Sequence, residues 1–371
     1  MIPTRARRRP AGLVLLPALV AVILVGCGVA ATPVPAPIGP SPTAALAPAA
    51  TGMPIPATPA ASPSPSPLAA TYPLSLTDDE GTVVTIAERP ARIVSLTPAT
   101  TEILFAVGAG PRVQGVTDAD DYPPAAKQIT QVVKWGTVDI EKIVGLGADL
   151  VIAGGNGFNS PDAIATLRSL GIPVLVVYAA NVAGVFRDIG LVAAAVGEGA
   201  GGRALVASLQ TQEDAVVAAV AAAGAPRPRV FYELDATKEI YTFADGIEQD
   251  ELIRLAGGDP ITTGSPTVFS IPLEKLVVAD PELILLGDFA PVPTPAQVRA
   301  RPGWAVMTAV KTGAIRPIDD ILVSRPGPRL VEALRALAVA INPALRLPPA
   351  PPAVPPAPTV IPSAPAASTT P

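Results

Sequence analysis

VDIEKIVGLGADLVIAGG, residues 138–155, is the stretch that decides the fold. Its first half predicts a short amphipathic helix, and its second half predicts an apolar strand that ends in glycines. The pattern returns 133 positions later as PLEKLVVADPELILLGD, residues 272–288. A glutamate, Glu141 or Glu274, opens each helix, where the helix dipole favours a negative charge. The repetition predicts two similar halves.

The segments around the two copies support this division. Apolar strands are predicted at 92–96 and 229–234, and the pattern Ala-Thr-x-Glu-Ile follows both of them, at 99–103 and at 236–240. Strands alternate with helical segments in each half, which is typical of parallel sheets whose ligands bind beyond the carboxyl ends of the strands. Residues 198–224 predict one long helix without proline. We therefore expect an α/β fold of two Rossmann-like lobes with parallel sheets, joined by one long rigid helix, with a ligand cleft between the lobes.

The ends of the chain differ from its centre in composition. Of the 47 prolines, 22 fall in residues 28–72 and 346–371, which also have few large apolar side chains. Such segments cannot bury enough apolar surface to offset their ordering entropy. The expected organisation is a signal peptide at 1–26, a disordered tether at 27–72, an N-terminal lobe at 73–197, the linking helix at 198–224, a C-terminal lobe at 225–345 and a disordered tail at 346–371.

Composition removes several classes of function. The chain has no histidine and one cysteine, so it cannot carry a Ser-His-Asp triad, a histidine-ligated metal or an internal disulfide. Its net charge is −5 and it has no basic patch, which makes nucleic acid an unexpected partner. Catalysis would have to use carboxylate, lysine or tyrosine side chains. A glycosidase would use two carboxylates, and the candidates for them are Glu233, Asp235 and Glu239.

The N-terminus predicts secretion and a lipid anchor. Four arginines precede an apolar run from Ala11 to Val25, which is too short for a comfortable membrane span and suits a signal peptide. The run ends in Leu-Val-Gly-Cys at 24–27, which resembles the lipobox of bacterial lipoproteins. By that resemblance the chain would be cut before Cys27, whose sulfur would carry the lipid. The expected location is extracytoplasmic, anchored to the cell membrane.

Motifs spread over residues 90–343 resemble the class III, or helical-backbone, substrate-binding proteins of ABC importers. These motifs are RIVSLTPATTE at 92–102, DYPP at 121–124, DIEKIV at 139–144, LAGG at 255–258, RPGW at 301–304 and SRPGPR at 324–329. The DYPP and RPGPR segments are most similar to the cobalamin-binding branch, and ferric-siderophore binders are close relatives. The resemblance implies a binding protein rather than an enzyme, without a cofactor or metal of its own. It also implies a monomer that serves a permease dimer with its ATPase subunits.

The resemblance also assigns residues. Glu141 and Glu274 match the two glutamates through which family members dock on permease arginines. The ligand, a macrocycle or a metal chelate, would lie between the lobes. The positions that match its binding residues are Trp135, Tyr241, Phe269, Ser324, Arg325, Tyr122, Ala119 and Ala99. At Ala119 cobalamin binders commonly carry an aromatic residue, so the pocket is expected to be more open here.

The leading hypothesis is a membrane-tethered receptor that hands a corrinoid to an ABC importer. Within the same family, a ferric-siderophore or haem receptor is the alternative. A carboxylate-dependent extracytoplasmic glycosidase is the alternative from another class, and it predicts two carboxyl groups that face each other across a pocket. An adhesion or structural lipoprotein is a third alternative, and it predicts no deep cleft.

Overall fold

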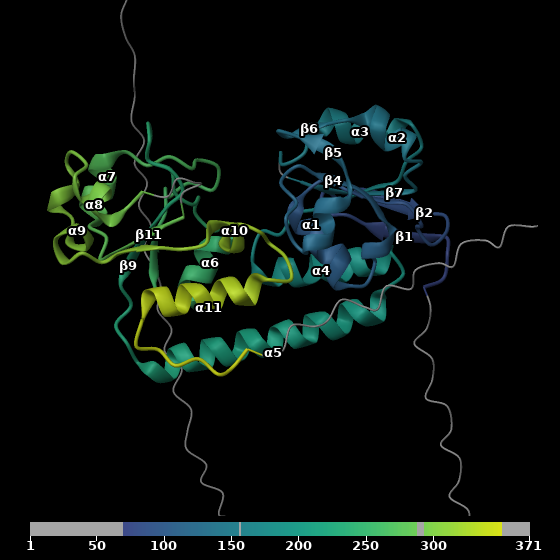
Figure 1. Ribbon diagram of the computed structural model, residues 1–371. Helices are drawn as coiled ribbons and strands as arrows, with labels where there is room; N and C mark the ends of the chain where they lie inside the picture. The colour runs from purple at the N-terminus through teal and green to yellow at the C-terminus, as the bar shows by residue number, and fades with distance from the viewer. Residues whose placement is uncertain (1–69, 156, 288–292, 351–371) are drawn as a thin grey trace, which may run out of the picture. The chain divides into compact units, whose positions relative to one another are not determined.

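The computed structural model describes residues 70–155, 157–287 and 293–350. The predicted signal peptide, Cys27, nearly all of the tether and most of the tail lie outside these ranges. The described chain begins with an antiparallel hairpin of β1 (Leu74–Thr77) and β2 (Val83–Ile86), and then forms two further sheets with their helices (Figure 1). No helix of the described part is long and apolar enough to cross a membrane.

The first large sheet has the strand order β6-β5-β4-β3-β7-β8, and its strands are parallel except for β6, which pairs antiparallel with β5. Its centre is buried on both faces: Ile93 belongs to one apolar cluster and its neighbour Val94 to another. Alternation of side chains along a strand produces this division. The strands are β3 (Ile93–Ser95), β4 (Val113–Thr117), β5 (Thr130–Lys134), β6 (Thr137–Val138), β7 (Leu150–Gly154) and β8 (Val174–Val177).

The second large sheet is wholly parallel, with the order β10-β9-β11-β12. Here too the central strand divides two clusters, since Tyr232 packs on one face and Phe231 on the other. The fold class predicted from the sequence, two α/β lobes with parallel sheets, is confirmed. The strands are β9 (Arg229–Glu233), β10 (Asp259–Ile261), β11 (Leu283–Leu286) and β12 (Ile315–Pro317).

Helices follow the strands in both lobes. In the N-terminal lobe they are α1 (Pro98–Ala106), α2 (Ile140–Gly145), α3 (Pro161–Ser169) and α4 (Val182–Ala195), with short 3-10 turns at Gly110–Arg112 and Pro124–Gln128. In the C-terminal lobe they are α6 (Glu248–Leu255), α7 (Leu273–Ala279), α8 (Pro295–Arg299), α9 (Thr308–Thr312), α10 (Asp320–Val323) and α11 (Leu330–Ile341), with a 3-10 turn at Trp304–Val306.

The predicted linking helix is α5 (Gly199–Ala223), which packs against α4 and α11. Leu209 and Val216 bury their side chains in an apolar cluster that holds residues of both lobes, so one continuous core runs along this helix. Gly202 allows the closest approach: a Cβ there would lie 2.3 Å from the Cβ of Ala193 on α4. The helix is therefore clamped by packing, which fits the rigid connection expected from its sequence.

The repeated stretch occupies equivalent places in the two sheets. Helix α2 leads into β7, which pairs with β3, and α7 leads into β11, which pairs with β9. In each copy the acid of the turn accepts the N–H of an arginine at the start of the neighbouring strand: Asp149 that of Arg92, just before β3, and Glu282 that of Arg229, the first residue of β9. The division into two similar halves rests on this match.

The second echo, at 99–103 and 236–240, is not structural. Residues 99–103 lie in α1, whereas Tyr241 forms isolated bridges with Asp235 and Ser270. The backbone after β9 therefore extends toward residue 270, and no helix forms at 236–240. The similar letters in the two places reflect composition and not a shared conformation.

The close packing of α4 on α5 predicts opposite effects for two chemically identical substitutions. Gly202→Ala should destabilise the fold, because overpacking a tight contact costs about 1–3 kcal/mol and outweighs the gain in helix propensity. Gly190→Ala on α4 should stabilise it by up to about 1 kcal/mol, because a Cβ there meets nothing within 4 Å. Denaturant unfolding of both variants measures the difference, and equal shifts of the same sign would contradict the packing argument.

Candidate functional site

Glu141 and Glu274 occupy the same position in their helices, the second residue of α2 and of α7. Both side chains are exposed, and within the described residues neither carboxylate has a hydrogen bond or an ion pair. At the start of α2 the N-cap Asp139 accepts the N–H of Lys142 at 3.0 Å, so Glu141 is not needed for capping. Each lobe therefore presents one uncommitted carboxylate.

Trp135 lies at the carboxyl end of β5 in a two-residue turn. Lys134 and Thr137 pair across β5 and β6, and the two residues between them, Trp135 and Gly136, have φ of 50° and 78°. Positive φ at both positions is the geometry of a tight hairpin turn, and it is strained for a tryptophan. The Trp135 N–H donates to Asp118 Oδ2 at 3.0 Å, while the side chain is 95% exposed. The turn thus holds a large apolar ring in solvent.

In the second lobe, the predicted rings Tyr241 and Phe269 lie on adjacent backbone segments. Tyr241 bridges to Ser270, and the N–H of Thr242 donates to the carbonyl of Phe269 at 2.8 Å. Both side chains are exposed. The Tyr241 hydroxyl donates to Glu239 Oε2 at 3.2 Å, and this hydrogen bond raises the pKa of Tyr241. Two of the predicted binding rings therefore come from one exposed region of the C-terminal lobe.

Four of the other predicted residues come together where the two lobes meet. The Arg325 guanidinium donates to the carbonyl of Ala119 at 3.1 Å, and the backbone beside it, at Gly327, approaches Ala99. Tyr122 lies under a guanidinium of the same segment, that of Arg329, at 4.4 Å from the ring centroid. The family resemblance assigns these residues separately, and in the structure they lie close together.

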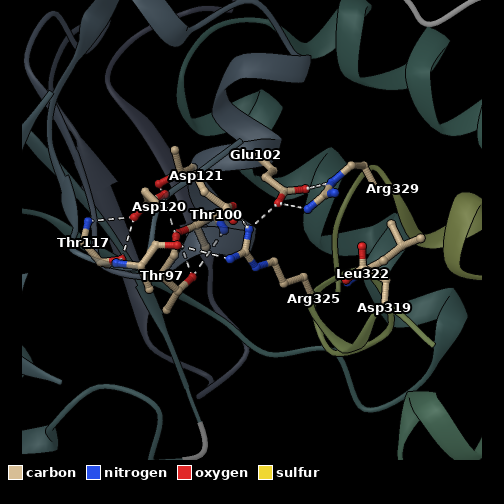
Figure 2. Close-up of polar contacts among 12 residues, drawn as sticks. Thr97, Thr100, Glu102, Thr117, Asp120, Asp121, Asp319, Leu322, Arg325 and Arg329 are labelled. Atoms are coloured by element: carbon tan, nitrogen blue, oxygen red, sulfur yellow. Dashed lines mark hydrogen bonds and ion pairs between the residues drawn. The ribbon is translucent and has the colours of Figure 1, made fainter. Parts of the chain in front are cut away.

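Glu102 on α1 is the centre of this group, and the sequence analysis did not single it out. Its side chain is 1% exposed and accepts two hydrogen bonds from Arg329, Nε to Oε2 at 2.8 Å and Nη2 to Oε1 at 2.6 Å (Figure 2). Arg325 Nη1 donates to Glu102 Oε1 at 3.1 Å and to Asp121 Oδ1 at 2.5 Å. The hydrogen bonds that Arg329 donates to Glu102 raise the pKa of Arg329. Two carboxylates thus balance two guanidiniums across the lobes.

The first turn of α1 is fixed by a cluster of buried hydroxyls. Thr97 is the N-cap and accepts the N–H of Thr100 at 3.3 Å, and the Thr100 hydroxyl lies 2.6 Å from that of Ser95 on β3. The neighbouring loop after β4 is shaped by Asp120, which accepts both the N–H and the hydroxyl of Thr117 (Figure 2). These local bonds hold Glu102 and Asp121 where the two arginines reach them.

Two predicted residues are committed to partners within the protein. Arg325 is used by Glu102, Asp121 and Ala119, and the Ser324 hydroxyl donates to Asp320 Oδ1 at 2.8 Å. Asp320 also accepts the Tyr232 hydroxyl, and burial raises the pKa of Asp320. Ser324 and Arg325 therefore fasten their loop to both lobes. A sequence pattern cannot reveal the pairings of Arg325, because Glu102 and Asp121 lie 223 and 204 residues away in the chain.

The carboxylates proposed for a glycosidase do not form a facing pair. Glu233 on β9 is fully buried, and both of its oxygens accept hydrogen bonds from Arg301, at 2.6 and 2.7 Å. Asp235 accepts from Thr237, and Glu239 accepts from Tyr241. A catalytic acid needs access to the bond that it protonates, and Glu233 has none in this arrangement.

Comparison with known proteins shows which family the chain is similar to. A family model described as periplasmic binding protein matches residues 93–322. The ABC transporter substrate-binding lipoprotein YvrC of Bacillus subtilis is 31% identical over 275 residues, which is 73% of this chain and 86% of that protein. The crystal structure of the vitamin B12-binding protein BtuF of Vibrio cholerae is similar with a TM-score of 0.59 and 26% identity, covering 68% of this chain and 97% of that one. The haem-binding protein RhuT of Roseiflexus gives the same TM-score and identity, covering 67% and 97%.

The cluster around Glu102 predicts a large loss of stability on removal of one charge. Glu102→Gln removes the buried charge that compensates two partly buried guanidiniums, and breaking a buried pair in this way costs about 3–5 kcal/mol. Asp259→Asn removes the exposed partner of Arg227, and it should cost about 1 kcal/mol or less. Chemical denaturation of the two variants compares them, and similar small losses would show that the cluster contributes little.

Proposed function

The chain belongs to the periplasmic binding protein family and is a substrate-binding protein of an ABC transporter, and from this premise we propose that its solute is a corrinoid of the cobalamin type. The observation that carries the proposal is Trp135, a ring that the β5–β6 turn holds almost wholly in solvent. An indole ring exposed on a strained turn costs stability, and stacking on a flat apolar ligand recovers that cost. Tyr241 and Phe269 would supply rings from the other lobe.

The charges near Ala119 favour a neutral macrocycle over an anionic one. Arg325 and Arg329 are already balanced by Glu102 and Asp121, and Asp121 is partly exposed at the same place. A ligand with free carboxylates would have to displace Asp121 from Arg325 or lie beside it. A corrinoid whose periphery carries neutral amides can instead accept or donate hydrogen bonds there. Haem and ferric siderophores remain the alternative solutes within the same family. The similar Roseiflexus structure, for example, is that of a haem-binding protein.

We further propose that the protein is a lipoprotein held at the outer side of the cell membrane through Cys27. The support is the lipobox-like sequence at 24–27 and the name of the Bacillus subtilis relative, which is a substrate-binding lipoprotein. The proline-rich residues 28–72 would then connect the lipid to the binding domain. A tether of this kind lets a receptor move while it stays near its transporter.

The docking surface proposed for the permease consists of Glu141 and Glu274. Both are exposed, unpaired within the described residues and placed identically on α2 and α7. A permease dimer presents the same patch twice, and one carboxylate on each lobe would match these two equivalent patches. Ion pairs at such a surface guide the approach of two proteins and fix their orientation.

Ligand titration followed by tryptophan fluorescence tests the solute. The chain has two tryptophans, and Trp304 is buried against Phe231. Cyanocobalamin and cobinamide should quench the emission saturably, with most of the quenching lost in Trp135→Phe and kept in Trp304→Phe. Haem and a ferric siderophore are titrated in parallel. Saturable quenching by haem alone would replace the corrinoid assignment, and an unchanged response in Trp135→Phe would exclude this ring from the site.

Transport measurements test the docking surface. Glu141→Ala combined with Glu274→Ala should reduce uptake at least about ten-fold, in cells whose own transporter depends on this protein, because charged contacts of this kind are each worth a few kcal/mol. Ligand affinity should not change. Asp162→Ala is the matched control, because Asp162 is an exposed acid at the same position of α3. Equal uptake by the double variant and the control would refute the assignment.

A further inference from the structure

Phe158 is an exposed ring that neither the resemblance nor the site described above includes. It lies in the loop after β7, and its side chain is 70% exposed. We propose that Phe158 is a further ligand-contacting residue, which bounds the binding surface of the N-terminal lobe on the side opposite Trp135. The inference rests on the proposed binding of a flat macrocycle and extends it by naming the second wall.

The loop that carries Phe158 is fixed and not merely exposed. Asn159 is buried, and its side chain accepts the N–H of Gly154 at 2.8 Å and donates to the carbonyl of Leu96 at 3.1 Å. It therefore ties the end of β7 to the end of β3. The N–H of Phe158 donates to the carbonyl of Gly155 at 3.1 Å, which closes the turn. A scattered exposed apolar residue needs no explanation, but Phe158 projects from a loop whose backbone is fixed by the buried Asn159.

The position of Phe158 is next to the first turn of α1. A Cβ on Gly154 would lie 2.7 Å from Thr97 Cγ2 and 3.1 Å from the Cβ of Phe158, so both side chains border the same point. Thr97 caps the helix that carries Ala99 and Glu102. Glycine at 154 allows this approach, since any side chain there would collide with Thr97. Phe158 consequently borders the edge at which the site residues gather.

The distance between the two walls suits a macrocycle. Trp135 follows β5 and Phe158 follows β7, and these strands are parallel with β4 and β3 between them. The carboxyl ends of both therefore lie at one edge of the sheet. Three strand spacings of roughly 4.8 Å put the two strand ends about 14 Å apart. A flat tetrapyrrole can lie over the ends of β3 and β4 with one ring at each side.

The experiment measures corrinoid affinity of the purified protein by calorimetry, with cyanocobalamin and cobinamide as probes. Phe158→Ala should weaken binding about ten-fold or more, since burying a phenylalanine is worth at least that factor. The corrinoid affinity of Phe158→Leu should lie between those of the wild type and Phe158→Ala. Leu170→Ala is the control, because Leu170 is also an exposed apolar residue but lies at the C-cap of α3, and the affinity of this variant should equal that of the wild type.

A second measurement separates contact from an indirect effect. In the Trp135→Phe background, Phe158→Trp should restore saturable ligand quenching, because the new indole would lie against the ligand. Unchanged affinity in Phe158→Ala together with no quenching in Phe158→Trp overturns the inference while corrinoid binding itself stands. Absence of corrinoid binding by the wild-type protein instead refutes the proposed solute, and with it the ligand on which the inference depends.

Discussion

The buried carboxylate of Glu102 is the interaction on which the arrangement of the two lobes around the candidate site depends. It lies on the first turns of α1 in the N-terminal lobe and is held by two arginines of the segment before α11 in the C-terminal lobe. A buried charge is costly without partners, so the two guanidiniums must stay within hydrogen-bond distance of it. Any movement of the lobes that separated α1 from residues 325–329 would expose or strand these charges. The network is thus one connection between the lobes, and the packing of α5 on α4 and α11 is another.

This constraint determines what is left for the solute. The arginines at the junction are neutralised inside the protein, and the hydroxyls of Ser95, Thr97 and Thr100 bond to one another or to the backbone. The groups turned to solvent at the strand-end edge of the first lobe include two rings, Trp135 and Phe158, and each lies in a loop that a side-chain hydrogen bond fixes. Recognition would then rest on stacking and shape, with polar groups behind the surface fixing its form. Such a surface is suited to a large flat ligand and poorly suited to a small charged one.

Much of the fold could be predicted from local patterns, and the reasons are physical. The sequence LVIAGG after a short helix predicts a buried strand of a parallel sheet, and the proline-free run at 198–224 predicts α5, because each pattern is read within a few turns of chain. The echo at 236–240 misled because the same letters can form a helix or an extended bridge, and the decision belongs to residue 270, with which Tyr241 pairs. Glu102 belongs to the motif at 92–102, but its role at the centre of the arginine cluster cannot be predicted from the sequence, because its partners are 223 and 227 residues away. Long-range pairing of charges has no periodicity that a single sequence displays.

The two functional surfaces also differ in how they are built, and the difference follows from what each must do. Glu141 and Glu274 sit on short helices with no internal partner among the described residues, so their charges stay available to another protein. The charged residues around Glu102 are paired with one another across the lobes, so in the proposed site the rings would supply most of the contact with the solute. The two proposed surfaces are thus of different kinds: one consists of carboxylates without internal partners, and the other lies around a buried charge network that joins the two lobes.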